Sequence, residues 1–127
     1  MKKFYITTSI PYVNAPPHIG FALEVIQADV VARWNRQQGR EVFFLTGADE
    51  HGTKIATAAA DKGVSPQEFT DEISRKFREL ADVLNISNND FIRTSDQERH
   101  WPVVQEVWQK LKENDDLEKR SYEGLYC

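Results

Sequence analysis

The sequence is poor in cysteine, in positive charge and in long apolar runs. Cys127 is the one cysteine among 127 residues, which excludes an internal disulfide and indicates a reducing compartment. Twenty Asp and Glu outnumber 16 Lys and Arg, for a formal charge of -4. This is the wrong sign for a surface that neutralises many phosphates of a nucleic acid by itself. No apolar run approaches the roughly 20 residues of a membrane span. We therefore expect a cytoplasmic protein without a membrane partner.

What the sequence does contain is enough apolar material for one folded core. Apolar residues make up 40% of the chain, including 7 Phe, so disorder is not expected. A length of 127 residues fits a single domain. The start, Met1 to Ile6, is interrupted by Thr7 and Thr8 before it resembles a secretory signal, so we expect mature protein there.

Apolar periodicity predicts alternating strands and helices. Short apolar or β-branched runs predict strands at residues 4–9, 41–46 and 91–93. Three- and four-residue apolar spacing predicts helices at 18–38, 55–61, 66–84 and 101–112, and residues 119–127 are expected to begin a hairpin or a small appended element. Trp34, Trp101 and Trp108 fall at helical spacing and are predicted to lie in the core. The alternation indicates an α/β fold, a parallel sheet flanked by helices.

Two polar segments, residues 10–20 and 47–54, each follow a predicted strand. In a parallel sheet both lie at the carboxyl edge, where ligands bind in this architecture. We therefore expect them to meet in one cleft. Tyr12 and Asn14 lie in the first segment, where they either line a small pocket or serve as ordinary loop residues, with Asn14 forming a turn before Pro16.

The sequence Pro17-His18-Ile19-Gly20 opens the long predicted helix. Unpaired N–H groups and the helix dipole favour phosphate oxygens at such an end. His18 in the first turn can donate a hydrogen bond to charge that grows on phosphorus, and Gly20 lets a base or ribose approach the backbone. The alternative is that His18 only caps the helix.

The second segment places Asp49, Glu50 and His51 directly after a buried strand. A carboxylate there can hold a substrate ammonium group by a charge-assisted hydrogen bond, and Asp49 is the candidate. The alternative is that Asp49 and Glu50 are favoured simply by a following helix dipole. A metal site made of the three is disfavoured because adjacent residues rarely point at one ion.

Four blocks of the sequence, in order, carry a family resemblance: residues 7–14, 17–20, 46–54 and 90–94. Together they resemble the methionyl-tRNA synthetase family of class I aminoacyl-tRNA synthetases. The resemblance implies that residues 1–117 are the N-terminal half of a Rossmann-like catalytic domain. It implies that residues 118–127 begin the connective insertion. It further implies an enzyme that uses ATP and Mg²⁺ to make methionyl-adenylate and then esterifies tRNA.

The resemblance also assigns nucleotide-binding residues. His18 matches the first histidine of the class I His-x-Gly-His signature, implied to stabilise the α-phosphate in the transition state. Gly20 and Glu24 match positions that accept the adenosine. Phe21 stands where the signature has its second histidine, so this site lacks one hydrogen-bond donor and adenylation is expected to be slower if that donor contributes.

On the amino-acid side, Ile10 and Tyr12 match positions that line the methionine pocket, and Asp49 matches the carboxylate that holds the methionine amino group. The family's zinc lies in its connective insertion. Cys127 resembles the first zinc ligand, but one cysteine cannot hold zinc, so no metal is expected in this segment.

The family's lysine-rich second signature and its anticodon-binding domain are absent from the chain. We therefore expect a segment that is inactive alone and that needs a missing C-terminal half or self-associates through exposed edges. It would meet tRNA only through regions not present here. Two alternatives remain: a non-catalytic nucleotide- or partner-binding copy, which Phe21 favours, and a compact nucleotidyltransferase, which the 46–54 block disfavours.

Overall fold

The computed structural model describes residues 2–121 and 123, which form one three-stranded parallel sheet and four helices. The strands lie in the order β1-β2-β3, and both pairings are parallel. In chain order the elements are β1 (Lys3–Thr7), α1 (Ile19–Gln37), β2 (Glu41–Ala48), α2 (Thr53–Asp61), α3 (Pro66–Val83), β3 (Asp90–Arg93) and α4 (Trp101–Glu113). The predicted α/β class with a Rossmann-like parallel sheet is confirmed. None of the described helices is both long and apolar enough to cross a membrane.

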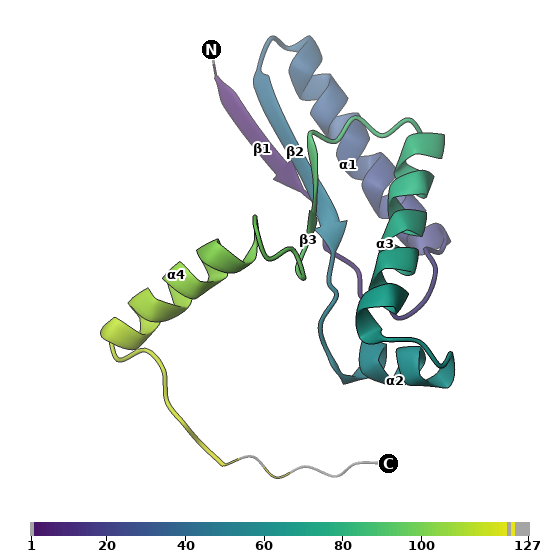
Figure 1. Cartoon of the computed structure of the whole chain (residues 1–127). Helices are drawn as coiled ribbons and strands as arrows, with labels where there is room; N and C mark the ends of the chain where they lie inside the picture. The colour runs from purple at the N-terminus through teal and green to yellow at the C-terminus, as the bar shows by residue number, and fades with distance from the viewer. Residues whose placement is uncertain (1, 122, 124–127) are drawn as a thin grey trace.

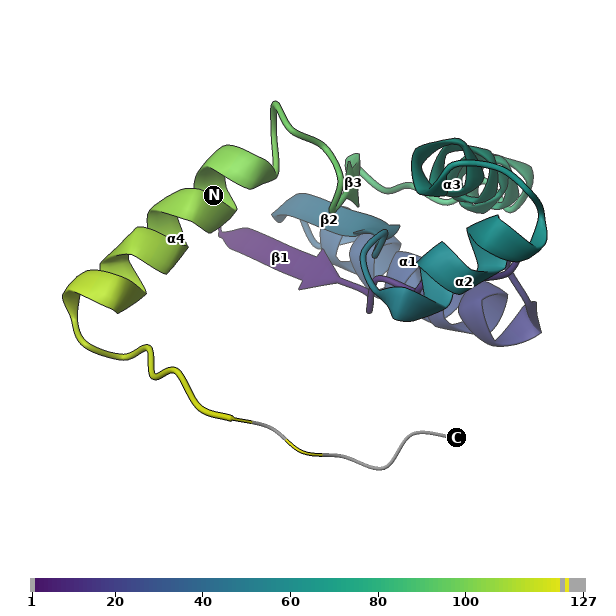
Figure 2. The same cartoon turned by 60° about the horizontal axis from the view of Figure 1, so that its bottom comes forward.

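The helices divide unequally between the two faces of the sheet. Figures 1 and 2 show α1 and α3 together on one side, while α4 extends as an arm on the other. Two right-handed crossovers in succession place α1 and α3 on the same face. The core lies between them and the sheet, and its largest fully buried apolar residues are Phe44, Phe69, Ile55, Ile73, Val13 and Val25.

The three tryptophans are not in this core, so that prediction was wrong. Trp34 is 54% exposed and Trp108 is 60% exposed. The helices were predicted correctly, but α1 carries apolar residues on two faces, and the buried face is the one that bears Phe21 and Val25. No residue of α4 is buried, and its apolar side chains remain exposed.

Strand β2 is two residues longer than predicted because Gly47 and Ala48 pair with Ile92 and Arg93 of β3. A Cβ at Gly47 would lie 2.3 Å from the carbonyl oxygen of Ile92. The strands can approach this closely only because residue 47 has no side chain.

Replacing Gly47 with Ala is expected to force β3 away from β2 and to lower the free energy of unfolding by about 1–3 kcal/mol. Denaturant unfolding of the chain measures this loss. Gly39→Asn is the matched control, because a Cβ there meets no atom within 4 Å and Asn tolerates positive φ. Equal stability of G47A and wild type would contradict the contact.

A buried carboxylate ties α1 to the segment between α3 and β3. Asp29 accepts hydrogen bonds from the Ser87 backbone N–H at 2.9 Å, from the Ser87 hydroxyl, and from Arg33 Nε at 2.7 Å. Burial acts to raise the pKa of Asp29, but the hydrogen bonds from Ser87 and Arg33 outweigh it and the pKa lies below its ordinary value. The ionised form is therefore the one that stabilises the fold.

Because the pKa of Asp29 is lower in the folded chain than in the unfolded chain, its contribution is complete above about pH 4 and is lost as pH falls through the folded value. Asp29→Asn should lower the free energy of unfolding by about 1–2 kcal/mol at pH 6. The difference in the free energy of unfolding between D29N and wild type should shrink as denaturant titrations are repeated at pH values below 4. A gap that stays constant down to pH 3 would contradict this assignment.

Candidate active site

The two polar loops that the sequence places after β1 and β2 meet through their backbones. Tyr12 and Asp49 form an isolated parallel bridge. The Asp49 N–H donates to the Pro11 carbonyl at 2.9 Å, and the Val13 N–H donates to the Asp49 carbonyl at 3.2 Å. The fully buried Val13 anchors this first loop in the core. The strands thus continue beyond the sheet as two adjacent segments, as expected of neighbouring parallel strand ends.

His18 lies at the far end of the same loop, as the N-cap of α1. Its backbone is extended, and its Nδ1 accepts a hydrogen bond from the Gly20 N–H at 3.0 Å. The capping alternative is therefore observed, but it does not exclude a chemical role. A neutral imidazole that accepts through Nδ1 carries its proton on Nε2. The capping bond therefore leaves the Nε2–H of the exposed His18 ring as a hydrogen-bond donor.

Gly20 provides the space that His18 occupies. A Cβ at residue 20 would lie 2.7 Å from His18 Cε1 and 2.9 Å from His18 Nδ1. We expected this glycine to let a base or ribose approach the backbone. In the structure, the neighbour that uses the space is the imidazole.

Gly20→Ala is therefore expected to move the His18 ring out of its capping position while the helix itself is retained, since Ala favours helix. Two-dimensional NMR of the chain should show a large shift of the residue 20 amide and of the His18 ring resonances. Ala22→Gly, which alters the same helical turn, is the control. An unchanged His18 environment in G20A would refute the close packing.

Phe21 and Glu24 occupy different surroundings one turn into α1. Phe21 is 5% exposed and packs edge-to-face on Phe77, with ring centroids 4.9 Å apart. The position of the second signature histidine is thus part of the core. Both carboxylate oxygens of Glu24 accept from Ser9, at 2.7 Å from the backbone N–H and 2.9 Å from the hydroxyl, which ties the end of β1 to α1.

The predicted methionine-pocket residues lie on the open side of the first loop. Ile10 is 37% exposed and Tyr12 is 54% exposed. Tyr12 lines a hollow of about 200 Å³ together with Gly52, Thr53 and Lys54. The structure therefore brings Tyr12 together with the start of α2 and with Asp49, whereas Asn14 is exposed.

Asp49 is half-buried and its carboxylate is held from two directions. Its Oδ1 accepts from the Thr94 hydroxyl at 3.3 Å and from the His51 N–H at 3.4 Å. Both contacts are long, and they engage one of the two carboxylate oxygens. A substrate cation can therefore pair with this group without first breaking a short internal bond.

Glu50 is a structural residue that the sequence prediction missed. Its side chain is fully buried and accepts hydrogen bonds from the hydroxyls of Ser74 and Ser95 and from Arg93 Nε, the last at 2.6 Å. Burial acts to lower the pKa of Arg93, but bonds to Glu50 and Asp71 outweigh it and raise the pKa. The network joins the ends of β2 and β3 to α3.

These contacts explain why Asp49, Glu50 and His51 do not make a metal site. Glu50 is directed into the protein, whereas His51 is exposed and contacts Thr94. Within residues 2–121 and 123, no three His, Cys, Asp or Glu side chains are grouped as a metal would require. Cys127, the suggested first zinc ligand, lies outside the described residues. The sequence predicts a hairpin or a small appended element at residues 119–127. Of these, residues 119–121 and 123 are described, and they have no regular secondary structure.

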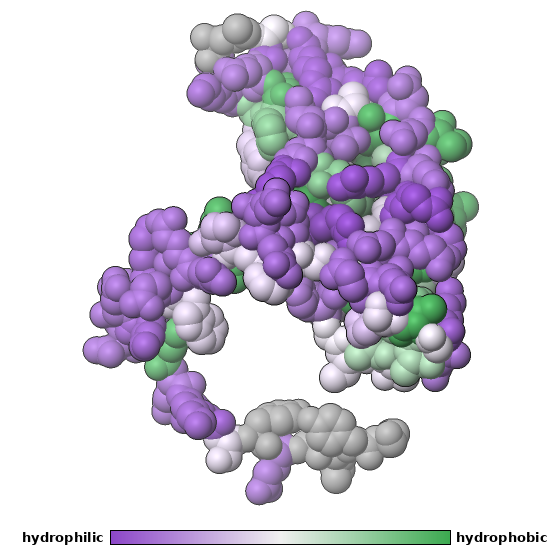
Figure 3. Space-filling model, viewed as in Figure 1, coloured by the Kyte–Doolittle hydropathy of each residue, from purple (hydrophilic) through white to green (hydrophobic). Residues whose placement is uncertain are grey.

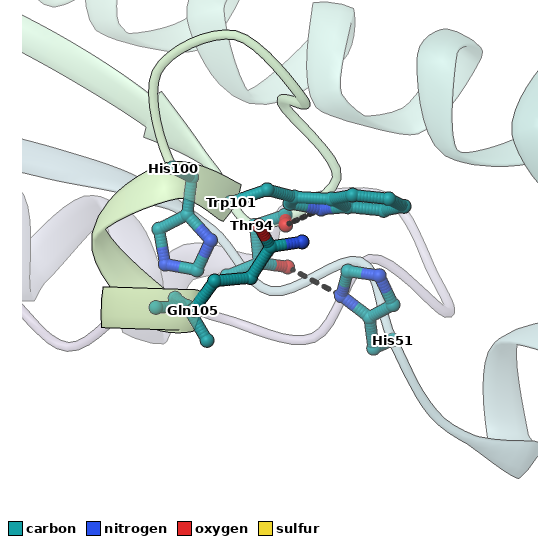
Figure 4. A pocket seen from close by; sticks show the side chains of 6 residues that line it. His51, Thr94, His100, Trp101 and Gln105 are labelled. Carbon is teal, nitrogen blue, oxygen red and sulfur yellow. Dashed lines mark hydrogen bonds between the residues drawn. The ribbon is translucent and has the colours of Figure 1, made fainter. Parts of the chain in front are cut away.

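A second hollow, of about 290 Å³, lies between His51 and the start of α4. Its lining consists of His51, Thr94, His100, Trp101, Val104 and Gln105. Figure 4 shows His51 and Trp101 facing each other across it. The Trp101 Nε1–H donates to the Thr94 carbonyl at 3.1 Å. Trp101 thus lines a surface hollow rather than the core.

Comparison with known proteins decides the family. The family model described as "tRNA synthetases class I (M)" matches residues 4–127, which is nearly the whole chain. The chain belongs to the methionyl-tRNA synthetase family. The match includes the loop that carries His18 and the segment from Thr46 to Lys54.

Individual relatives agree with the family assignment. The chain is 54% identical over 125 residues to the methionine--tRNA ligase of Thermotoga maritima, and 52% identical over 124 residues to that of Rickettsia bellii. Both alignments cover 98% of this chain but only 20% and 24% of the relatives. The chain therefore spans about a fifth to a quarter of the length of these ligases.

A solved structure agrees with the fold. Mycobacterium tuberculosis methionyl-tRNA synthetase in complex with methionyl-adenylate is 43% identical, with a TM-score of 0.87, over 91% of this chain and 22% of that structure. The present chain thus has the fold of one part of that structure.

Proposed function

We propose that this chain is the N-terminal, nucleotide- and methionine-binding part of the catalytic domain of a methionine-tRNA ligase. The reaction is the ATP-dependent activation of methionine and its transfer to tRNA. The observation that carries the proposal is the Tyr12–Asp49 bridge. It joins the loop that ends at His18 to the loop that carries a partly open carboxylate.

In the proposed first step, the methionine carboxylate attacks the α-phosphorus of ATP and pyrophosphate leaves. Negative charge grows on the α-phosphate oxygens. His18 is proposed to donate Nε2–H to one of these oxygens, and its Nδ1 bond to Gly20 supports this role because it fixes the required tautomer. The N-terminus of α1 adds its dipole in the same place.

Asp49 is proposed to hold the methionine ammonium group, while Ile10 and Tyr12 line the side-chain pocket. The exposure of Ile10 and Tyr12 supports a contact that a ligand completes. Gly20, Phe21 and Glu24 are proposed to face the adenosine, Phe21 through its backbone only.

Mg²⁺ would accompany ATP. It would be held by the phosphates of ATP together with water molecules and one or two carboxylates.

Exposed apolar side chains support the proposal that this chain works as part of a larger protein. In Figure 3 hydrophobic atoms are visible among hydrophilic ones on the arm formed by α4. Tyr5 and Phe43 stack on each other at the uncovered side of the sheet. The more exposed apolar residues of α1 and α4 are Ile19, Leu23, Val30, Trp34, Val103, Val107 and Trp108. Such surfaces are typical of an interface, and the rest of the catalytic domain and a second copy of this chain are its candidate partners.

The proposal is tested by methionine-dependent ATP–pyrophosphate exchange. The chain alone should show little exchange. A chimera in which the chain replaces the matching segment of the Thermotoga maritima ligase should restore it. An inactive but folded chimera would favour the non-catalytic binding module instead, and exchange that depends on a substrate other than methionine would refute the assignment.

His18→Asn should lower kcat of the chimera by about 100- to 1000-fold, the effect of removing one donor to the transition state. Asn is itself a good N-cap, so α1 should remain intact. Ser65→Ala removes the capping box of α3 and controls for the loss of a cap elsewhere. If H18N retains wild-type kcat, His18 has no role in the chemistry.

A further inference from the structure

We infer that Thr94 is a positioning residue for the methionine site: its hydroxyl sets the directions of the Asp49 carboxylate and of the His51 imidazole. The inference rests on the proposed function, in which Asp49 holds the methionine ammonium group. It goes further by giving a role to a residue at the end of the third strand, in the fourth of the sequence blocks, to which the resemblance assigns none.

The Thr94 hydroxyl oxygen is a junction for three consecutive residues of the loop after β2. It lies 2.8 Å from the Glu50 backbone nitrogen, 3.1 Å from His51 Nδ1 and 3.3 Å from Asp49 Oδ1. Figure 4 shows the contact between His51 and Thr94 beside the second hollow. Among the described residues, no other side-chain atom has hydrogen-bond contacts to all three of these residues.

The chemistry of a hydroxyl group fixes the direction of each bond. A threonine hydroxyl has one hydrogen to donate and two lone pairs that accept. The Glu50 N–H can only donate and the ionised Asp49 carboxylate can only accept. All three bonds therefore form at once only if His51 carries a proton on Nδ1, so that Nδ1–H and the Glu50 N–H donate to Thr94 and its hydroxyl donates to Asp49.

Thr94 is itself held rigidly. Its N–H donates to the Ala48 carbonyl at 3.1 Å, and its carbonyl accepts from Trp101 Nε1 at 3.1 Å. The residues on either side, Arg93 and Ser95, both bind the buried Glu50 carboxylate. A hydroxyl fixed in this way can hold a carboxylate in one orientation before the substrate arrives.

The consequence concerns methionine binding more than the chemical step. With Thr94 Oγ1–H engaged on Oδ1, the second carboxylate oxygen of Asp49 is left for the ammonium group. Without the hydroxyl, Asp49 gains rotational freedom and His51 loses its partner. The pocket then has to be ordered by the substrate, which weakens binding of methionine and leaves the ATP site at His18 unaffected.

The test compares Thr94→Val, which keeps the shape and removes the hydroxyl, with Thr94→Ser, which keeps the hydroxyl. Both are made in the Thermotoga chimera. T94V should raise KM for methionine about tenfold, the effect of one hydrogen bond to a charged group, with kcat and KM for ATP within about threefold of wild type. T94S should restore KM. An unchanged KM for methionine in T94V would overturn the inference, as would a kcat loss that T94S shares.

A second measurement is independent of activity and uses the 127-residue chain. Imidazole ¹⁵N shifts report the tautomer of each histidine. His51 should carry its proton on Nδ1 in wild type and T94S, and should move toward the Nε2–H form in T94V, while His18 stays Nε2-protonated throughout. If His51 is Nε2-protonated in wild type, the junction is wrong even in an active chimera. If the junction is present but the chimera is inactive, it is the proposed function that fails.

Discussion

The structure depends on parallel pairing that continues past the end of the sheet. β1 stops at Thr7, yet the chain returns at Tyr12 to lie beside Asp49. Because parallel strands present their carboxyl ends at one edge, two loops far apart in the sequence are brought together through their backbones. The backbone bonds of Pro11 and Val13 to Asp49 then fix their register. Everything proposed for the site uses this alignment, from the donor on His18 to the acceptor on Asp49.

Much of the fold could be predicted from local pattern, because a few neighbouring residues mark where most helices and strands begin. The capping box at Ser65 and Glu68 marks the start of α3, and α1 and α4 begin within one residue of the predicted positions. The pattern could not say which apolar face of α1 is buried. Trp34 has the spacing of a core residue but lies on the face that the three-stranded sheet leaves uncovered, and helical periodicity is the same on both faces.

Site residues could be predicted where they directly follow a strand. Contacts between residues far apart in the sequence were harder to predict. Asp49 was singled out by its place after β2. The same rule, applied to the third strand, would have indicated Thr94 and Ser95. Nothing in the sequence predicts that Glu50 would meet Ser74 on α3, since such a contact depends on how the helix packs. Nor does the sequence show that Phe21 belongs to the core, because its neighbour Phe77 is 56 positions away by the numbering of the two residues.

The loop after β2 directs consecutive side chains to opposite sides, and this makes its two acids unequal. Asp49 remains partly open, whereas Glu50 lies beneath it with all of its side chain enclosed. The longer acid spans the gap to α3 and β3, and the shorter one stops at the surface of the site. The order of the two acids, Asp49 before Glu50, therefore matters for the structure. A chain with Asp49 and Glu50 exchanged would have the same composition and charge, but its inner side chain would be one methylene shorter than the one that now reaches Ser74, Ser95 and Arg93, and its outer one would extend further into the space proposed for the amino acid.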